Sequence, residues 1–326
     1  MNSNRRDFMK VATAGIPLAA LASYGYAQED RLRDSIEVTK QMGRDRKQIF
    51  NMSGYAAPAI NHLRVGYIGL GNRGFASLKR LACMEGVEIR AIADCYEYPI
   101  VRARDWLKEH KCPAPAEYYA SEETWKDLVA RDDLDFIYVA TPPYWHAVMA
   151  LHSMLAGKHT STEVPMTMVL EDCWKLVEAS EKTKKHCTML ENCCYGNFET
   201  MTINMALQGV LGEIVHGEGA YIHYFPKQFQ MAKPPLSPKS APYYGWLTSA
   251  GKGNRYPTHG LGPVCQAMKI GCGDRLEYLT SVETDDFVRS SQVKELAAQG
   301  NPVYGPFKDR DYVGNMNSSL IRTMNG

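Results

Sequence analysis

Residues 63–74 decide the fold, and they read LRVGYIGLGNRG. The first half of this stretch is a short apolar segment typical of a buried strand, and Gly69, Gly71 and Gly74 then follow in the pattern G-x-G-x-x-G. Residues 75–84 have the apolar spacing of a helix. Glycines between a strand and a helix permit a tight turn and let backbone N–H groups approach a pyrophosphate at the positive end of the helix. The stretch therefore predicts a dinucleotide-binding strand–turn–helix unit.

A carboxylate strengthens this interpretation. A second predicted strand, Val87–Ala93, ends at Asp94, which lies about 20 residues beyond the last glycine, where a carboxylate accepts hydrogen bonds from both ribose hydroxyls. Such a group repels a 2′-phosphate, so NAD is favoured over NADP. The alternative is a glycine turn needed only for packing.

Strands and helices alternate along residues 61–194, which predicts a doubly wound parallel sheet of the Rossmann type. Further strands are expected at 135–140, 159–163 and 186–190. Further helices are expected at 100–110, 147–156, 170–184 and 198–208. A long alternating run at 213–224 indicates a change to an antiparallel sheet. The expected fold class is an α/β Rossmann domain followed by an α+β domain with a largely antiparallel sheet.

The N-terminus has the features of an export signal. Residues 4–10 read NRRDFMK, and the pair Arg5 and Arg6 resembles a twin-arginine motif. A mild apolar stretch follows at 11–22, and Ala27 ends a small-residue cleavage site. An ordinary amphipathic helix is the alternative. Twin-arginine substrates cross the membrane already folded, so a periplasmic enzyme exported in this way can carry its nucleotide inside.

Four segments are expected along the chain: a signal peptide at 1–30, a linker or arm at 31–60, an NAD-binding Rossmann domain at 61–194 and a substrate-binding α+β domain at 195–326. Residues 318–324 have the pattern of a strand, and Asn325 with Gly326 then forms a strong hairpin-turn signal. We therefore expect the second domain to be cut short at its C-terminus.

Composition narrows the classes of partner. Lys and Arg number 37 against 36 Asp and Glu, so the net charge of +1 gives no electrostatic reason to expect nucleic acid. No apolar run after the first thirty residues is long enough to span a bilayer. The nine cysteines are an odd number without the spacing of small disulfide-rich domains, which argues against a disulfide framework. No Cys-x-x-Cys pair suggests zinc, so no metal is expected. A homo-oligomer is compatible with the sequence.

The segment Thr141-Pro142-Pro143-Tyr144-Trp145-His146 follows the third main strand, at the carboxyl edge where a dinucleotide crosses the sheet. We expect Trp145 to cover the adenine or ribose and His146 to contact the cofactor. The alternative is a strand ended by proline and followed by a helix start.

These features resemble the Gfo/Idh/MocA oxidoreductase superfamily, in which a substrate-binding sheet domain follows a Rossmann domain. Its sugar dehydrogenases carry a Glu-Lys-Pro motif whose lysine serves as acid and base. Here the motif reads Glu163-Val164-Pro165, and Val164 carries no proton. The departure argues against a simple alcohol dehydrogenase.

Within that superfamily the chain resembles glycoside hydrolase family 109, the α-N-acetylgalactosaminidases. The resemblance covers nearly all of residues 60–326 except the loop at 224–255. The motifs that carry it are GLGNRG at 69–74, TEVP at 162–165, MLENCCY at 189–195, GEIVHGEGAYIH at 212–223 and YPTHGLGP at 256–263.

This resemblance implies contacts for a cofactor and a sugar. Besides Gly69, Gly71 and Gly74, the NAD contacts are Asn72, Arg73, Asp94, Pro143, Tyr144, Trp145, His146, Glu163, Val164 and Asn192. The substrate contacts are Tyr221, Tyr256, Pro257, Thr258 and His259. The implied partner is a glycan or glycoside with a terminal N-acetylgalactosamine or related sugar.

The implied reaction has no net redox change. NAD+ takes a hydride from sugar C3, the C2 proton is removed, the glycosidic oxygen leaves C1, water adds and NADH returns the hydride. His259 is the candidate for the C3 hydroxyl, Tyr195 for the C2 proton, and Glu163 for orienting the nicotinamide or assisting proton transfer. Considered singly, His259 is as compatible with a structural role as with a catalytic one, and Tyr221, on a predicted alternating strand, is more typical of a packing residue.

One departure bears on specificity. Family members carry a Trp-Arg-Leu element whose arginine contacts substrate, whereas Trp246 is followed here by Leu247. Either Lys252 or Arg255 substitutes, or the sugar specificity differs. Two other functions stay open at this point: an NAD-dependent sugar or cyclitol oxidoreductase, and an inactive fragment or binding protein.

Overall fold

The computed structural model describes residues 46–222, 253–254, 256–300, 305 and 308–326. These residues form two compact units that meet in sequence between Leu190 and Glu191. We name them the Rossmann unit (described residues 46–190) and the C-terminal unit (described residues of 191–326). The expected signal peptide, the arm up to residue 45 and all of the loop at 224–255 except residues 253 and 254 lie outside the described residues.

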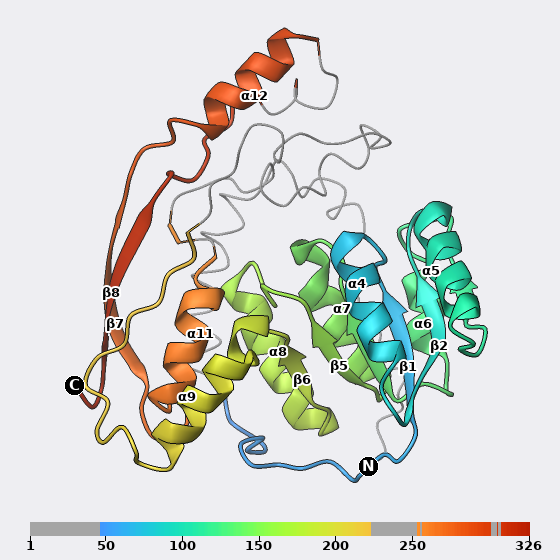
Figure 1. The fold of residues 1–326 in the computed structure, drawn as a ribbon, viewed down its shortest axis with the longest axis horizontal. Helices are drawn as coiled ribbons and strands as arrows, with labels where there is room; N and C mark the ends of the chain where they lie inside the picture. Colours follow the sequence, from blue (N-terminus) through green and yellow to red (C-terminus); the bar gives the residue numbers. More distant parts are fainter. Residues whose placement is uncertain (1–45, 223–252, 255, 301–304, 306–307) are drawn as a thin grey trace. The chain divides into compact units, whose positions relative to one another are not determined.

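The Rossmann unit contains a six-stranded parallel sheet, in the order β3-β2-β1-β4-β5-β6 (Figure 1). The strands are β1 (Leu63–Ile68), β2 (Val87–Ala93), β3 (Ala116–Tyr118), β4 (Phe136–Val139), β5 (His159–Thr162) and β6 (Cys187–Met189). The strand order reverses between β1 and β4, and such a point is where doubly wound sheets bind nucleotides. The expected Rossmann class is confirmed.

Side-chain alternation divides the core between the two faces of this sheet. Val65 and Tyr67 of β1 pack with residues of α4 (Asn72–Ala82) and α5 (Glu97–Glu109). Ile68 packs on the opposite face with residues of α6 (Trp125–Ala130) and α7 (Pro143–Leu155). Successive residues of a strand point to opposite faces, so both faces of a fully covered strand must be apolar. This explains why β1 reads as a continuous apolar run.

The last helix of this unit, α8 (Leu170–Thr183), packs against α7 through small and apolar side chains. The described part of the expected arm lies against α8 and β6: Arg46 forms an ion pair with Glu181 at 2.5 Å, and the backbone N–H of Ala57 donates to His186 at 3.3 Å. Within the described ranges, every helix is too short or too polar to span a bilayer.

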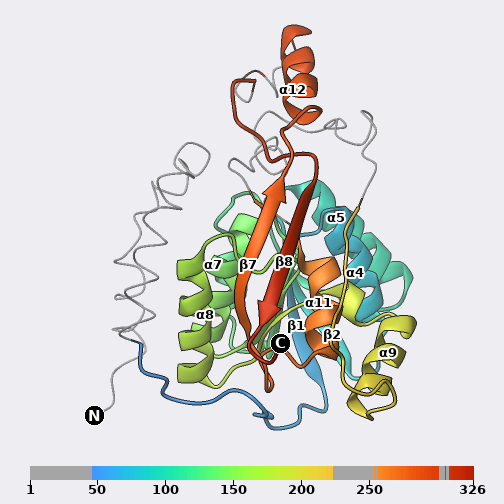
Figure 2. The ribbon, with the colours of Figure 1, turned by 90° about the vertical axis from the view of Figure 1, so that its left-hand side faces the viewer.

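The C-terminal unit contains four helical segments and a two-stranded antiparallel sheet (Figure 2). The elements are η1 (Asn192–Cys194), α9 (Asn197–Leu207), α11 (Thr258–Ala267), β7 (Leu276–Glu283), α12 (Arg289–Ala298) and β8 (Asn317–Thr323). Strands β7 and β8 pair from Leu276 with Thr323 to Glu283 with Asn317. The strand expected at 318–324 is therefore confirmed, and its partner β7 is a strand that the sequence pattern did not reveal.

The strand expected at 213–224 is wrong for the described residues 213–222, which form no strand. Two glycines explain the difference. A Cβ at Gly219 would lie 2.1 Å from Gly260 O, and a Cβ at Gly217 would lie 2.7 Å from a methyl of Val264. The backbone of these residues therefore packs directly on α11 and does not pair with another strand. Alternating apolar and polar residues form a strand only where a neighbouring strand completes the backbone hydrogen bonds.

Candidate active site

The glycine loop between β1 and α4 shows which glycines the fold itself requires. Gly69 has φ +90°, and a Cβ on it would lie 2.6 Å from Ala140 O. A Cβ on Gly74 would lie 2.0 Å from Gly69 O. Gly71 differs, because a Cβ there would meet no atom within 4 Å. Open space at the second glycine, at the N-terminus of α4, fits a dinucleotide whose pyrophosphate approaches the backbone closely.

Asp94, at the end of β2, holds this loop. Its Oδ2 accepts a hydrogen bond from Leu70 N–H at 2.8 Å, and its Oδ1 accepts one from Tyr96 N–H at 3.0 Å. Burial raises the pKa of Asp94, and these two backbone bonds oppose that effect. Cys95 Sγ also donates to Oδ1 at 3.7 Å, so Oδ2 is the oxygen that can accept a further bond from a ribose hydroxyl.

Arg102 of α5 also fixes the loop, and the sequence interpretation missed it. Its Nη2 donates to Leu70 O at 2.6 Å and to Gly71 O at 3.2 Å, and its guanidinium lies 4.3 Å from the Phe75 ring centroid. The only available sequence signal was a cation on the helix after β2, which is too common to be informative.

Glu163 is buried under α4 with both carboxylate oxygens engaged. Oε1 accepts hydrogen bonds from Tyr138 OH at 2.8 Å and Ser77 Oγ at 3.1 Å, and Oε2 pairs with Arg73 Nε at 3.0 Å. Burial, as the largest cause, raises the pKa of Tyr138 to about 12. The arrangement favours the orienting role predicted for Glu163 over proton transfer, and it fixes Arg73 at the second residue of α4, after Asn72.

The side chains of Trp145 and His146 require a correction. Trp145 lies in the core, 6.4 Å from Trp125 between ring centroids. His146 is 1% exposed, with its ring nitrogens 2.7 Å from Thr141 O and from Pro165 O. Burial lowers the pKa of His146. The expectation of exposed side chains is corrected here, because the helix start at Pro143 turns both inward, as the alternative interpretation described; the cofactor contact at these positions stays a prediction.

The remaining predicted cofactor residues occupy three places. Tyr144 follows Pro143 in the first turn of α7 and is partly buried, which raises its pKa. Val164 is 9% exposed and follows Glu163. Asn192 begins η1 in the C-terminal unit, and its Nδ2 donates to Cys193 Sγ at 3.5 Å.

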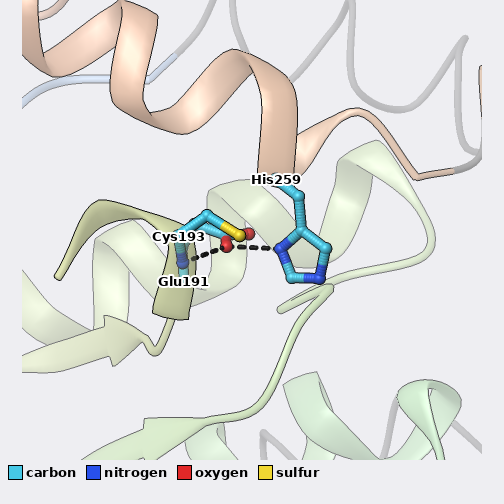
Figure 3. A group of neighbouring side chains, drawn as sticks. All are labelled: Glu191, Cys193 and His259. Carbon is cyan, nitrogen blue, oxygen red and sulfur yellow. Dashed lines mark hydrogen bonds and ion pairs between the residues drawn. The ribbon is translucent and has the colours of Figure 1, made fainter. Parts of the chain in front are cut away.

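In the C-terminal unit, the side chain of His259 lies against the buried carboxylate of Glu191 (Figure 3). His259 is the second residue of α11, and its Nδ1 is hydrogen bonded to Glu191 Oε1. The same oxygen accepts a bond from Cys193 N–H at 2.9 Å. Burial acts to raise the pKa of Glu191, but the bonds from Cys193 N–H and His259 outweigh it and hold that pKa below its ordinary value.

Two tyrosines flank the histidine. The rings of Tyr221 and Tyr256 lie 4.8 Å and 4.9 Å from the His259 ring and 5.0 Å from each other, measured between centroids. Pro257 precedes α11 and Thr258 begins it. The predicted substrate residues therefore come together at the start of this helix. Tyr195, the residue after η1, is 61% exposed.

Two glycines of the THGLG segment make this arrangement feasible. A Cβ on Gly260 would lie 2.8 Å from Ala220 N, so glycine here lets the residue before Tyr221 lie on the helix. A Cβ on Gly262 would lie 3.0 Å from Cys194 Sγ and 3.1 Å from Glu191 Cγ, so glycine at this position lets α11 approach η1.

Glu191 is the main residue that sequence reasoning missed. It belongs to a motif noted for its resemblance, MLENCCY, but nothing in the pattern indicates that a carboxylate pairs with a histidine 68 positions away. Two residues were candidates to replace the substrate-binding arginine of the family, namely Lys252 and Arg255. Both lie outside the described residues.

Comparisons with known protein families agree with both halves of the chain. Residues 63–191 match the oxidoreductase family with an NAD-binding Rossmann fold. Residues 195–326 match the glycosyl hydrolase 109 C-terminal domain. The chain therefore contains an NAD-binding Rossmann domain followed by a domain typical of glycosyl hydrolase family 109.

Solved structures share the fold. Scyllo-inositol dehydrogenase from Lactobacillus casei with bound NAD(H) and scyllo-inositol aligns with a TM-score of 0.56 at 14% identity, over 81% of this chain and 67% of that one. Aldose-aldose oxidoreductase from Caulobacter crescentus aligns with a TM-score of 0.55 at 18% identity, over 81% and 68%. At these identities the likeness concerns the fold alone.

Curated relatives are much more similar in sequence. A glycosyl hydrolase family 109 protein of Shewanella baltica (strain OS195) is 39% identical over 329 residues, which cover 100% of this chain and 67% of the relative. One from Shewanella sp. (strain W3-18-1) is 37% identical with the same coverage. The chain thus spans about two thirds of the length of these relatives. With both halves matched and this identity over its full length, the chain belongs to glycosyl hydrolase family 109.

Proposed function

We propose that the protein is an NAD-dependent glycosidase that removes a terminal α-N-acetylgalactosamine or a related sugar. Family membership and the NAD-binding Rossmann domain support the class of enzyme. The observation that carries the proposal is the pairing of His259 with buried Glu191 beside the rings of Tyr221 and Tyr256.

The hydrogen bond assigns a tautomer to His259. Its Nδ1–H donates to Glu191, so the lone pair of the neutral ring lies on Nε2. A carboxylate on the far nitrogen fixes the orientation and the tautomer of the ring. In this proposal His259 accepts the proton of the sugar C3 hydroxyl through Nε2, and Glu191 is its positioning residue.

The tyrosines supply the rest of the sugar site. Tyr221 and Tyr256 present amphipathic rings beside the base, and such rings combine an apolar face with a hydroxyl for hydrogen bonding. Once C3 is oxidised the C2 proton is acidic, and Tyr195 is the proposed group that removes it. The exposed position of Tyr195 is compatible with contact to a substrate.

NAD, when bound, supplies the hydride acceptor for sugar C3 and restores the hydrogen at the end of the cycle. The backbone at Gly71 and the cation of Arg73 would hold its pyrophosphate, and Asp94 would accept the ribose hydroxyls. Glu163 positions the guanidinium of Arg73 through an ion pair, in which Oε2 lies 3.0 Å from Arg73 Nε.

The export route is part of the proposal, supported by the sequence around Arg5 and Arg6. A periplasmic enzyme with no net redox change needs no supply of free nucleotide. Replacing both arginines by lysine is expected to leave a folded precursor inside the cell, and normal export of that variant would overturn this part.

The activity test uses an aryl α-N-acetylgalactosaminide and the complete protein with no nucleotide added. The proposal predicts release of the aryl group over many turnovers without accumulation of NADH. Stoichiometric NADH formation with a free sugar or cyclitol, and no glycoside cleavage, would instead identify an oxidoreductase.

A further inference from the structure

Three potential ligand atoms converge beside the start of α11, all within the C-terminal unit. A carboxylate oxygen of Glu191, the sulfur of Cys193 and a ring nitrogen of His259 lie within 4.8 Å of one another. Figure 3 shows the Nδ1 edge of the imidazole turned towards the carboxylate and the sulfur. Cys193 has no part in the proposed reaction, so its presence here calls for another explanation.

The burial of this cluster points to a missing partner. The side chain of Glu191 is 5% exposed and that of His259 is 12% exposed. Glu191 Oε1 receives two hydrogen bonds, whereas Oε2 is buried and makes no hydrogen bond of good geometry among the described residues, although the Thr258 side chain interacts with this carboxylate. Leaving a buried charged acceptor unsatisfied is costly, and a cation on the carboxylate removes that cost.

The types of donor atom indicate which cation fits. Thiolate, imidazole and carboxylate together are ligands of zinc and of related divalent transition metals. Magnesium and calcium prefer oxygen donors and disfavour sulfur. The N–H donated by Asn192 Nδ2 to Cys193 Sγ, at 3.5 Å, supports a thiolate.

We propose that Glu191, Cys193 and His259 bind one divalent transition-metal ion of the zinc class, with a fourth position left for water. Ligand distances of about 2.3 Å to sulfur and about 2.0 Å to nitrogen place these two atoms roughly 3.5 Å apart in a tetrahedral site. The sulfur therefore moves inward by up to about 1.3 Å, which a rotation of the Cys193 side chain supplies. The hydrogen-bonded Nδ1 of His259 and the Glu191 carboxylate separate to admit the ion.

Binding redistributes protons in a defined way. The Cys193 thiol loses its proton to solvent, and the proton on His259 Nδ1 moves to Nε2 as the metal takes the Nδ1 lone pair. Nε2 then donates and no longer accepts, so the ion blocks the base role of His259. This consequence rests on the proposed function, whereas the metal site itself does not.

Cobalt(II) is the probe, because a cobalt–thiolate bond absorbs in the near ultraviolet through charge transfer. The full chain, treated with chelator and kept free of substrate and added nucleotide, is titrated with cobalt. A saturable band with one equivalent, displaced by zinc, is expected. Since neither sugar nor turnover enters the measurement, it can fail independently of the proposed function.

Three variants assign the ligands. Cys193→Ser is expected to abolish the charge-transfer band with an unchanged circular dichroism spectrum, and Glu191→Gln is expected to weaken cobalt binding by at least about tenfold. Cys272→Ser is the matched control, since Cys272 is an exposed cysteine of the same unit, and it should retain the band. No saturable band in the wild type, or a band that persists in Cys193→Ser, would overturn the proposal.

Discussion

The two candidate binding regions differ in how far apart their parts lie in the sequence. The glycine loop is contiguous, from Gly69 to Gly74, and its carboxylate Asp94 ends the very next strand. The second region, which we call the histidine corner, contains Glu191, Tyr221 and His259. These residues come from three separate segments of the chain. A contiguous motif is recognisable because the local backbone alone explains it. A dispersed site is recognisable only in part, because its partners are chosen by packing.

The largest expected effect is at the histidine. His259→Ala removes the proposed base and should lower kcat by about 10²–10⁴-fold with little change in folding. Steady-state kinetics on the aryl glycoside and thermal melting measure the two quantities. His216→Ala is the control, because His216 is exposed and, among the described residues, pairs with Glu218 at 3.2 Å. Equal activity of both variants would remove His259 from the mechanism.

The carboxylate partner should have the next largest effect. Glu191→Gln keeps the shape but loses the charge that fixes the tautomer, so kcat should fall by about 10–100-fold. KM should change much less, because the sugar contacts are unaltered. Nitrogen NMR of the His259 ring should also show loss of the Nδ1–H tautomer. A fall in kcat without that spectroscopic change would contradict the positioning role.

Two glycines of the loop should separate binding from folding. Gly71→Ala meets open space and should leave the melting temperature unchanged while reducing the NAD retained after purification. Gly74→Ala places a Cβ 2.0 Å from Gly69 O and should destabilise the fold by about 1–3 kcal/mol. Retained nucleotide, assayed after denaturation, and thermal melting distinguish the two. If Gly71→Ala retains as much NAD as the wild type, the assignment of the glycine loop to NAD binding is contradicted.

The smallest effect concerns acid stability of the Rossmann unit. Asp135 accepts bonds from Arg64 Nε at 2.8 Å and Nη2 at 2.6 Å, and these bonds hold the pKa of Asp135 below its ordinary value. The stabilisation is therefore full above the unfolded pKa of about 4 and is lost as the pH falls through the lower folded pKa. Asp135→Asn should flatten the fall in melting temperature below about pH 5. An equally steep fall in the variant would exclude the pair as the cause.

The parallel sheet could be predicted because its strands other than β3 each carry an apolar pattern of their own. The prediction of β2 agrees with the structure to the residue, and helices α4, α5, α7, α8 and α9 lie within a few residues of their expected positions. β3, with three residues, and α6, with six, are too short for a periodic signal.

The errors share one physical cause, which is competition from tertiary packing. Residues 213–222 alternate as a strand does, but Gly217 and Gly219 let the backbone lie on α11 instead. Trp145 and His146 follow a strand at the expected edge, yet the turn of α7 directs both into the core. Whether a side chain faces a ligand or a neighbouring helix depends on residues distant in sequence, and periodicity carries no such information.

The central claim is that the glycoside is cleaved by oxidation at C3 and elimination across C1 and C2. Substrate turned over in D2O by the complete protein tests it directly. Removal of the C2 proton and its later return from solvent should give a product carrying deuterium at C2. Direct displacement by two carboxylates never breaks that carbon–hydrogen bond. Deuterium at C2 is the predicted result, and a product with only protium at C2 would contradict the account.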